Sequence, residues 1–285
     1  MADIPFTMYS GAGNLFVVVD AFNNPTVFGT VKMKALAQTV SNRKGPIGSD
    51  GMIVLGRSGK APFMMNFYNP DGSFGALCGN GARCAVQAAV DFGVVASPDT
   101  AFEVLGELVR AEDVAGQETP QLRVYYNDPK KIKLKFKLSV GGDLLDCSYV
   151  DLGSQHGVIF YDSSIKELDV PRLGTAVRNH QDFQPLGVNA NFAHIESDEH
   201  GEYIRIRTFE RGVEGETLAC GTGCMATAIS AYGLKKISSL PIRLKTQSGE
   251  FVKVNFTTDE SAHVKHLSLE GSAIRGKSGI VTVEG

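Results

Sequence analysis

Residues 69–85 read Asn-Pro-Asp-Gly-Ser-Phe-Gly-Ala-Leu-Cys-Gly-Asn-Gly-Ala-Arg-Cys-Ala, and the chain is organised around the first cysteine of this stretch. Cys78 follows a turn-forming segment and precedes Gly79 and Gly81, which let the backbone approach something small closely. Residues 82–92 are rich in alanine and have apolar residues at helical spacing, which predicts a buried helix. The start of a helix carries about half a positive charge and unpaired N–H groups, which stabilise a thiolate and bind a carboxylate.

A second copy of this arrangement lies in the other half of the chain. Residues 218–228 read Leu-Ala-Cys-Gly-Thr-Gly-Cys-Met-Ala-Thr-Ala and lead into a helix that we expect to end near Tyr232. Cys220 follows Cys78 by 142 positions (220 − 78) in a chain of 285 residues, which is close to half its length. Such spacing indicates a duplicated unit, in which a pseudo-twofold axis would bring the two helix starts face to face.

Two opposed thiols suit the inversion of a stereocentre next to a carboxylate. One group removes the Cα proton from one face while the other delivers a proton to the opposite face, whereas a single base tends to return the proton where it came from. Two cysteines have the same intrinsic pKa, so one pocket can work in both directions. The helix N-termini would stabilise the negative charge that develops on the substrate.

Both cysteine motifs resemble the two signatures of the diaminopimelate epimerase family. The matching stretches are residues 77–84 and 210–223, supported by residues 10–20, 45–51, 153–156 and 187–192 in the same order. Members of that family consist of two similar domains with the last strand returning to the first domain. The resemblance therefore implies residues 1–127, joined by the last strand at about 274–285, and residues 128–273 as the two domains.

Composition excludes several other functions. A hydrophobic content of 43% with 21% charged residues is typical of a soluble globular protein. The net charge of −3 offers no basic face, so we expect no nucleic-acid partner. The N-terminus has no secretory pattern, and no apolar run approaches the ~18 residues of a membrane span, so we expect a cytoplasmic protein without a membrane partner. The five cysteines follow neither a disulfide rhythm nor zinc-ligand spacing.

The expected elements alternate between strands and a few helices. Strands are predicted at residues 4–9, 16–20, 52–55, 63–68, 102–109, 122–126, 132–138, 145–152, 158–161, 191–195, 203–209, 242–246, 251–256, 263–269 and 280–283. Besides the two cysteine helices, helices are predicted at 31–40, capped by Thr30, and at 170–178. Residues 115–120 read as a loop. We therefore expect an α+β fold with two pseudo-symmetric domains, each a curved, mainly antiparallel sheet or barrel around a central helix.

Four residues are the candidate catalytic groups. Cys78 and Cys220 are each followed by closely spaced glycines, whereas Cys84 and Cys224 lie a turn or more inside the predicted helices and fit the common role of buried cysteines as core residues. His156 and Glu210 could each be structural. The resemblance instead implies that they lie beside the cysteines, where a neutral imidazole or a carboxylate can accept a thiol proton.

The resemblance also implies a set of substrate-binding residues. Asn14, Asn69 and Asn189, each of which could otherwise be a turn residue, would bind the distal amino and carboxylate groups of a diamino diacid. Asn80 and Thr222, with the N–H groups of the glycines that follow each cysteine, would hold the carboxylate beside the reacting carbon. Arg211, and with it Glu210, completes the set, because a guanidinium can bind a carboxylate through two parallel hydrogen bonds. The glycines whose N–H groups would hold this carboxylate are Gly79 and Gly81 after Cys78, and Gly221 and Gly223 after Cys220.

The expected function is interconversion of LL- and meso-diaminopimelate, without a metal or pyridoxal phosphate cofactor. The resemblance implies that Cys78 is the base and Cys220 the acid for the LL form. A homodimer is the expected assembly. The sequence departs from the family pattern at Leu15, Gly51, Ser154-Gln155 and Glu214. A racemase of another amino acid such as histidine therefore remains an alternative, as does a redox or metal-binding cysteine protein.

Overall fold

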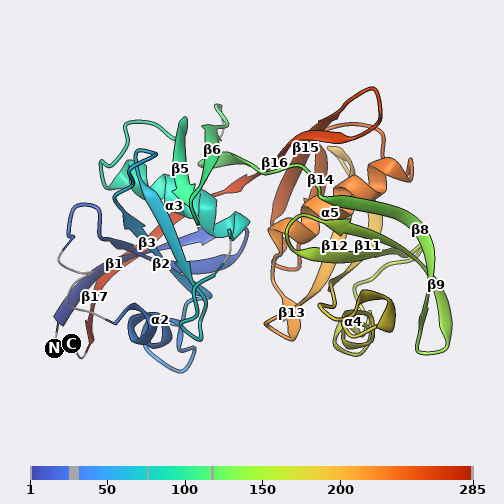
Figure 1. The fold of residues 1–285 in the computed structure, drawn as a ribbon, viewed down its shortest axis with the longest axis horizontal. Coiled ribbons are helices and arrows are strands. Elements are labelled where there is room, and N and C mark those ends of the chain that lie inside the picture. Colours follow the sequence, from blue (N-terminus) through green and yellow to red (C-terminus); the bar gives the residue numbers. More distant parts are fainter. Residues whose placement is uncertain (1, 26–31, 76, 117–118, 284–285) are drawn as a thin grey trace. The chain divides into compact units, whose positions relative to one another are not determined.

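Figure 1 shows the fold of this protein in a computed structural model, which describes residues 2–25, 32–75, 77–116 and 119–283. The chain divides into two compact units. Unit 1 comprises Met1–Tyr125 and Glu270–Gly285, and unit 2 comprises Tyr126–Leu269. Each unit is built mainly from strands, so each is described by itself.

Unit 1 is a mixed sheet in which antiparallel pairs predominate. Strand β17 (Ile274–Val283) pairs antiparallel with β1 (Ala2–Gly11), and β1 with β2 (Asn14–Asp20). Next come β3 (Gly51–Gly56), parallel to β2, and β4 (Met64–Tyr68), antiparallel to β3. After a parallel contact of β4 with β5 (Thr100–Val104), antiparallel pairs lead through β6 (Glu107–Asp113) to β7 (Gln121–Tyr125).

Two helices cover the two faces of this sheet. Helix α2 (Met33–Ser41) joins β2 to β3, and its Leu36 and Val40 pack in one core cluster with Val17 and Val19. Helix α3 (Gly79–Asp91) joins β4 to β5 and packs against β1, β2 and β3. Because β2 and β3 are buried on both faces, they read as continuous apolar runs instead of alternating ones.

Unit 2 repeats the strand order of unit 1. Antiparallel strands β8 (Lys131–Val140), β9 (Asp143–Asp151) and β10 (Gln155–Phe160) come first. Strand β11 (Asn189–Asp198) is parallel to β10, and β12 (Gly201–Glu210) is antiparallel to β11. Strand β14 (Ile242–Lys245) is parallel to β12 and antiparallel to β15 (Phe251–Thr258), and β16 (Val264–Ser272) ends the series.

The helices of unit 2 also occupy the corresponding places. Helix α4 (Val170–Arg178) lies between β10 and β11, where α2 lies between β2 and β3, and α5 (Gly221–Gly233) corresponds to α3. Both α3 and α5 have 13 residues and begin directly after a cysteine. The duplication expected from the spacing of the two cysteines is thereby confirmed, and with it the α+β fold. Pairings among the described residues leave the sheets open, without closure into a barrel.

Some element boundaries differ from the prediction. The strand expected at 102–109 is two strands, β5 and β6, because Leu105 and Gly106 form a tight turn with φ of 52° and 84°. The expected cap Thr30 and first helical residue Val31 lie outside the described residues, as does part of the loop at 115–120. Two short elements were not predicted, β13 (Gly215–Thr217) and the 3-10 helix η1 (Gln181–Phe183). No helix in the described part of the chain is long and apolar enough to cross a membrane.

Candidate active site

Both candidate thiols occupy the same local position, the residue before a helix. Cys78 precedes α3 with φ −86° and ψ 117°, and Cys220 precedes α5 with φ −120° and ψ 108°. Their carbonyl groups accept the first helical hydrogen bonds, from Ala82 at 2.7 Å and from Cys224 at 2.9 Å. Neither first turn contains an acidic residue. Each helix start therefore keeps N–H groups that can bind an anion.

Cys220 forms a pair with Glu210, which ends strand β12. The Cys220 side chain hydrogen-bonds Glu210, and the hydroxyl of Thr217 donates to Glu210 Oε2 at 3.1 Å. Thr217 reaches this position because β13 pairs antiparallel with the end of β12. Cys220 and Glu210 are called the Cys220–Glu210 pair below.

The pKa values of this pair indicate where its proton resides. Burial raises the pKa of the Cys220 thiol well above its usual value, and the charge of Glu210 raises it further. The hydroxyl of Thr222, with its Oγ1 3.6 Å from Sγ, and the N–H of Gly223 oppose this rise. Burial also raises the pKa of Glu210, although hydrogen bonds from Thr217 and Cys220 lower it in part. At neutral pH the Cys220 proton therefore lies on sulfur, which donates a hydrogen bond to Glu210.

His156 is fully buried within β10, so it does not lie in the turn that precedes this strand. Burial, and secondarily the charge of Arg211, lowers its pKa to about 3. Asn191 Nδ2 lies 3.2 Å from Nδ1, and Ser154 Oγ lies 3.0 Å from Nε2. An amide N–H can only donate, so Nδ1 is the acceptor and Nε2 carries the hydrogen. The imidazole is neutral, and a proton from a thiol would have to displace the Asn191 contact.

Asn191 connects the histidine to the start of α5. Its amide is oriented by the carbonyl of Gly157, 3.0 Å from Nδ2, and by the hydroxyl of Thr208, 3.0 Å from Oδ1. A Cβ atom on Gly223 would lie 2.4 Å from Asn191 Oδ1 and 3.3 Å from Cys220 Sγ. Glycine is therefore required at 223 for close approach, not for turn geometry. Sequence reasoning missed Asn191, whose only signal was its place in the stretch 187–192.

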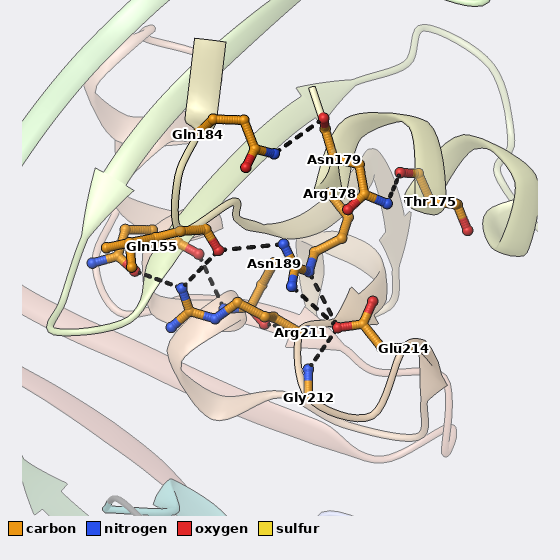
Figure 2. A network of polar contacts seen from close by, with 10 residues as sticks. Gln155, Thr175, Arg178, Asn179, Gln184, Asn189, Arg211, Gly212 and Glu214 are labelled. Carbon is orange, nitrogen blue, oxygen red and sulfur yellow. Dashed lines mark hydrogen bonds and ion pairs between the residues drawn. The ribbon is translucent and has the colours of Figure 1, made fainter. Parts of the chain in front are cut away.

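Asn189 and Arg211 meet beside the first residue of β10, as Figure 2 shows. Asn189 Oδ1 accepts a hydrogen bond from the backbone N–H of Arg211 at 2.8 Å, and its Nδ2 donates to the carbonyl of Gln155 at 3.0 Å. Arg211 Nη1 donates to Gln155 Oε1 at 3.0 Å and to the carbonyl of Leu186 at 3.3 Å. Sequence reasoning treated Gln155 only as a departure from the family pattern.

In unit 1, a buried polar network holds the start of α3. Arg83, which is fully buried, donates to Asn80 Oδ1 at 2.9 Å and to the carbonyls of Gly79 and Ser272 at 3.3 Å each. Asn80 Nδ2 in turn donates to Asn14 Oδ1 at 2.8 Å. The first turn of α3 is thus anchored by a cation, Arg83, that was quoted in the motif but not singled out.

The remaining candidate of unit 1, Asn69, lies in a separate turn. Its Nδ2 donates to Ser73 Oγ at 3.0 Å, and its backbone N–H donates to the Ser73 carbonyl at 2.9 Å. The other polar atom of the Asn14 amide, Nδ2, donates a hydrogen bond to Asp50 Oδ2 at 3.4 Å. The structure therefore groups Asn14 with Asn80 and leaves Asn69 in a turn of its own. No group of three or more histidine, cysteine and carboxylate side chains in the described ranges could hold a metal ion.

Comparison with known proteins identifies the family of this chain. The sequence profile of the family described as diaminopimelate epimerase matches residues 6–132 and 148–273. The chain belongs to this family. It is similar to the diaminopimelate epimerase of Chlorobaculum tepidum, with 35% identity over 96% of this chain and 100% of that protein. It is also similar to that of a Hydrogenobaculum species, with 34% identity over 98% of both chains.

A solved structure shares the fold at lower sequence similarity. The Bacillus anthracis phenazine biosynthesis protein of the PhzF family has a TM-score of 0.79 and 18% identity to this chain. The match covers 99% of this chain and 100% of that one. At this identity the likeness is evidence for the fold alone.

Proposed function

We propose that this protein is a diaminopimelate epimerase that interconverts the LL and meso isomers of 2,6-diaminopimelate. Family membership supports the reaction class, and the Cys220–Glu210 pair is the observation that carries the mechanism. The product would serve lysine and peptidoglycan precursor synthesis.

Each thiol acts on one face of the reacting carbon. For the LL isomer, Cys78 as thiolate removes the Cα proton, and Cys220 as thiol delivers its proton to the opposite face. The protonated state of Cys220 at neutral pH supports this acid role. After turnover, Cys78 is protonated and Cys220 is the thiolate, so the pocket is ready for the reverse direction.

Glu210 gives Cys220 its second role, that of a base. A thiol with a raised pKa is a weak nucleophile and base until its proton moves to an acceptor, and the carboxylate hydrogen-bonded to it is such an acceptor. Because burial also raises the pKa of Glu210, its carboxylate is a better proton acceptor than the same group would be at the surface. The hydrogen bond between the two groups gives the proton a direct path from sulfur to carboxylate.

The substrate carboxylate next to the reacting carbon would bind at the helix starts. Asn80 and Gly79 in one loop, and Thr222 and Gly221 in the other, lie in the first turns of α3 and α5. Negative charge that develops as the proton leaves is stabilised there by N–H groups and the helix dipole. We assign the distal carboxylate and amino groups to Arg211 and to the three asparagines of the predicted set, Asn14, Asn69 and Asn189.

The scheme uses only groups of the protein chain and needs no metal or pyridoxal phosphate. Its dependence on two reduced thiols fits the cytoplasm, where cysteines stay reduced. A homodimer stays a prediction.

The decisive experiment replaces Cys78 and Cys220 separately by alanine and follows epimerisation of LL-diaminopimelate. Each variant should lose activity by at least about 10³-fold, because the mechanism then lacks one of its two proton-transfer groups. Cys84→Ala and Cys224→Ala are matched controls, since they remove buried thiols further along the same two helices. Near-normal activity in either Cys78→Ala or Cys220→Ala would refute the two-thiol mechanism. Exchange of the α-proton in deuterated water, measured over a panel of L-amino acids, would separate this epimerase from a racemase of another amino acid.

A further inference from the structure

We propose that Gln155 is a positioning residue that orients the guanidinium of Arg211 for the substrate carboxylate. The inference rests on the proposed function, in which Arg211 binds the distal carboxylate.

Both polar atoms of the Gln155 side-chain amide make hydrogen bonds. Its Oε1 accepts from Arg211 Nη1 at 3.0 Å, and its Nε2 donates to Asp151 Oδ2 at 3.3 Å. Asp151 is the residue opposite Gln155 in the antiparallel pair of β9 and β10, so the contact follows from strand register. The acceptor that faces Arg211 is therefore fixed by the sheet and not by a mobile loop.

A second acceptor fixes the same nitrogen. The carbonyl of Leu186 accepts from Arg211 Nη1 and from Arg178 Nη1, each at 3.3 Å. Arg178 also forms an ion pair with Glu214 at 3.2 Å, and Glu214 Oε1 accepts from the N–H of Gly212 at 3.1 Å. Figure 2 shows the guanidinium of Arg178 directed toward Glu214, in the loop that carries Arg211. The position of the Leu186 carbonyl is thereby tied to the loop on which Arg211 lies.

The edge of the Arg211 guanidinium formed by Nε and Nη2 is left available for a ligand. With Nη1 committed to two acceptors, the plane of the group is set, while Nε and Nη2 make no hydrogen bond to any residue in the described part of the chain. Those two N–H groups form the edge that binds a carboxylate through two parallel bonds. Arg211 is partly exposed, so this edge can be reached by a ligand.

The amide is better suited to this task than a carboxylate. A glutamate at position 155 would also accept the hydrogen bond from Nη1, but its charge would neutralise Arg211 and weaken the attraction for substrate. Glutamine fixes the orientation and leaves the full positive charge available. Gln155 thus acts through Arg211 and has no contact with substrate of its own.

The test compares Gln155→Leu with wild type in steady-state epimerisation. Loss of one hydrogen bond to a charged group should raise KM about 10- to 100-fold, while kcat stays within about threefold because the reacting centre is untouched. Gln155→Glu should also raise KM, although it keeps the hydrogen-bond acceptor. Gln184→Leu is the matched control, because Gln184 lies nearby and bonds the Asn179 carbonyl instead of Arg211.

A double-mutant cycle separates positioning from a general structural role. In an Arg211→Met background, Gln155→Leu should change KM by less than about twofold, since the group through which it acts is gone. A KM for Gln155→Leu within twofold of wild type, or equal effects in both backgrounds, would overturn the inference while leaving the epimerase assignment intact. Absence of epimerisation by the wild-type protein would overturn the proposed function and this inference with it.

Discussion

Acid destabilisation centred on His156 is the prediction that the structure makes most quantitatively. The imidazole is fully buried and its pKa is lowered from 6.5 to about 3. In the unfolded chain the same group would titrate near its usual value, so the unfolded state binds a proton at mildly acidic pH and the folded state does not. Stability is therefore fully present above pH ~6.5 and is lost as the pH falls from there toward 3.

The size of the effect follows from these two pKa values. Between pH 7 and pH 5 the unfolded imidazole becomes almost fully protonated while the folded one stays neutral, which costs about 2 kcal/mol of unfolding free energy. The slope below pH 6 approaches ~1.4 kcal/mol per pH unit. No discount for solvent is needed, because the exposed fraction of the side chain is 0%.

The assay is urea unfolding at pH 7, 6 and 5, followed by circular dichroism. His156→Gln should be less stable than wild type at pH 7, because the Asn191 and Ser154 contacts are disturbed, but should lose about 2 kcal/mol less between pH 7 and pH 5. His200→Gln is the control for replacement of a histidine by glutamine, since that side chain is 71% exposed. If His156→Gln follows the pH dependence of wild type, the imidazole is not the buried neutral group described above.

Two further predictions concern the Cys220 side of the site. Glu210→Gln should lower kcat/KM about 10²- to 10⁴-fold, equally in both directions because the equilibrium between isomers is unchanged, and pH–rate profiles should lose the acidic limb set by the raised pKa of Glu210. An acidic limb that persists in this variant would exclude Glu210 as the acceptor of the Cys220 proton. Gly223→Ala should destabilise the protein by about 1–3 kcal/mol and reduce activity, because its Cβ would lie 2.4 Å from the fixed Asn191 amide. Gly215→Ala is the control with open space around it, and equal melting temperatures for the two variants would refute the close contact.

The two cysteine motifs and the duplication could be predicted because both are local properties. Cys78 and Cys220 can be recognised in the sequence because glycines and an alanine-rich segment follow each of them. Each of these segments is a helix in the structure. The strands expected at residues 16–20 and 52–55 correspond to β2 and β3, whose sequences are uninterrupted apolar runs. Where a single turn decided the outcome, as at Leu105 and Gly106 between β5 and β6, the apolar pattern continued across the turn and concealed it.

The residues that support the site could not be predicted from the sequence pattern. Arg83, Asn191 and Gln155 are ordinary polar residues in sequence, and nothing in their spacing distinguishes a buried amide from a surface one. Their roles depend on partners far away in the chain, such as Ser272 for Arg83 and Arg211 for Gln155. Such partners are brought together by strand register and helix packing.

By itself, the sequence of this protein determined the reaction class, the pair of candidate thiols and the duplicated α+β plan, because glycine placement and apolar periodicity act over a few residues. Only the tertiary structure decided the protonation of Cys220, the neutrality of His156 and the orientation of Arg211. Desolvation and hydrogen-bond geometry govern these properties, and both depend on which distant segments enclose a side chain.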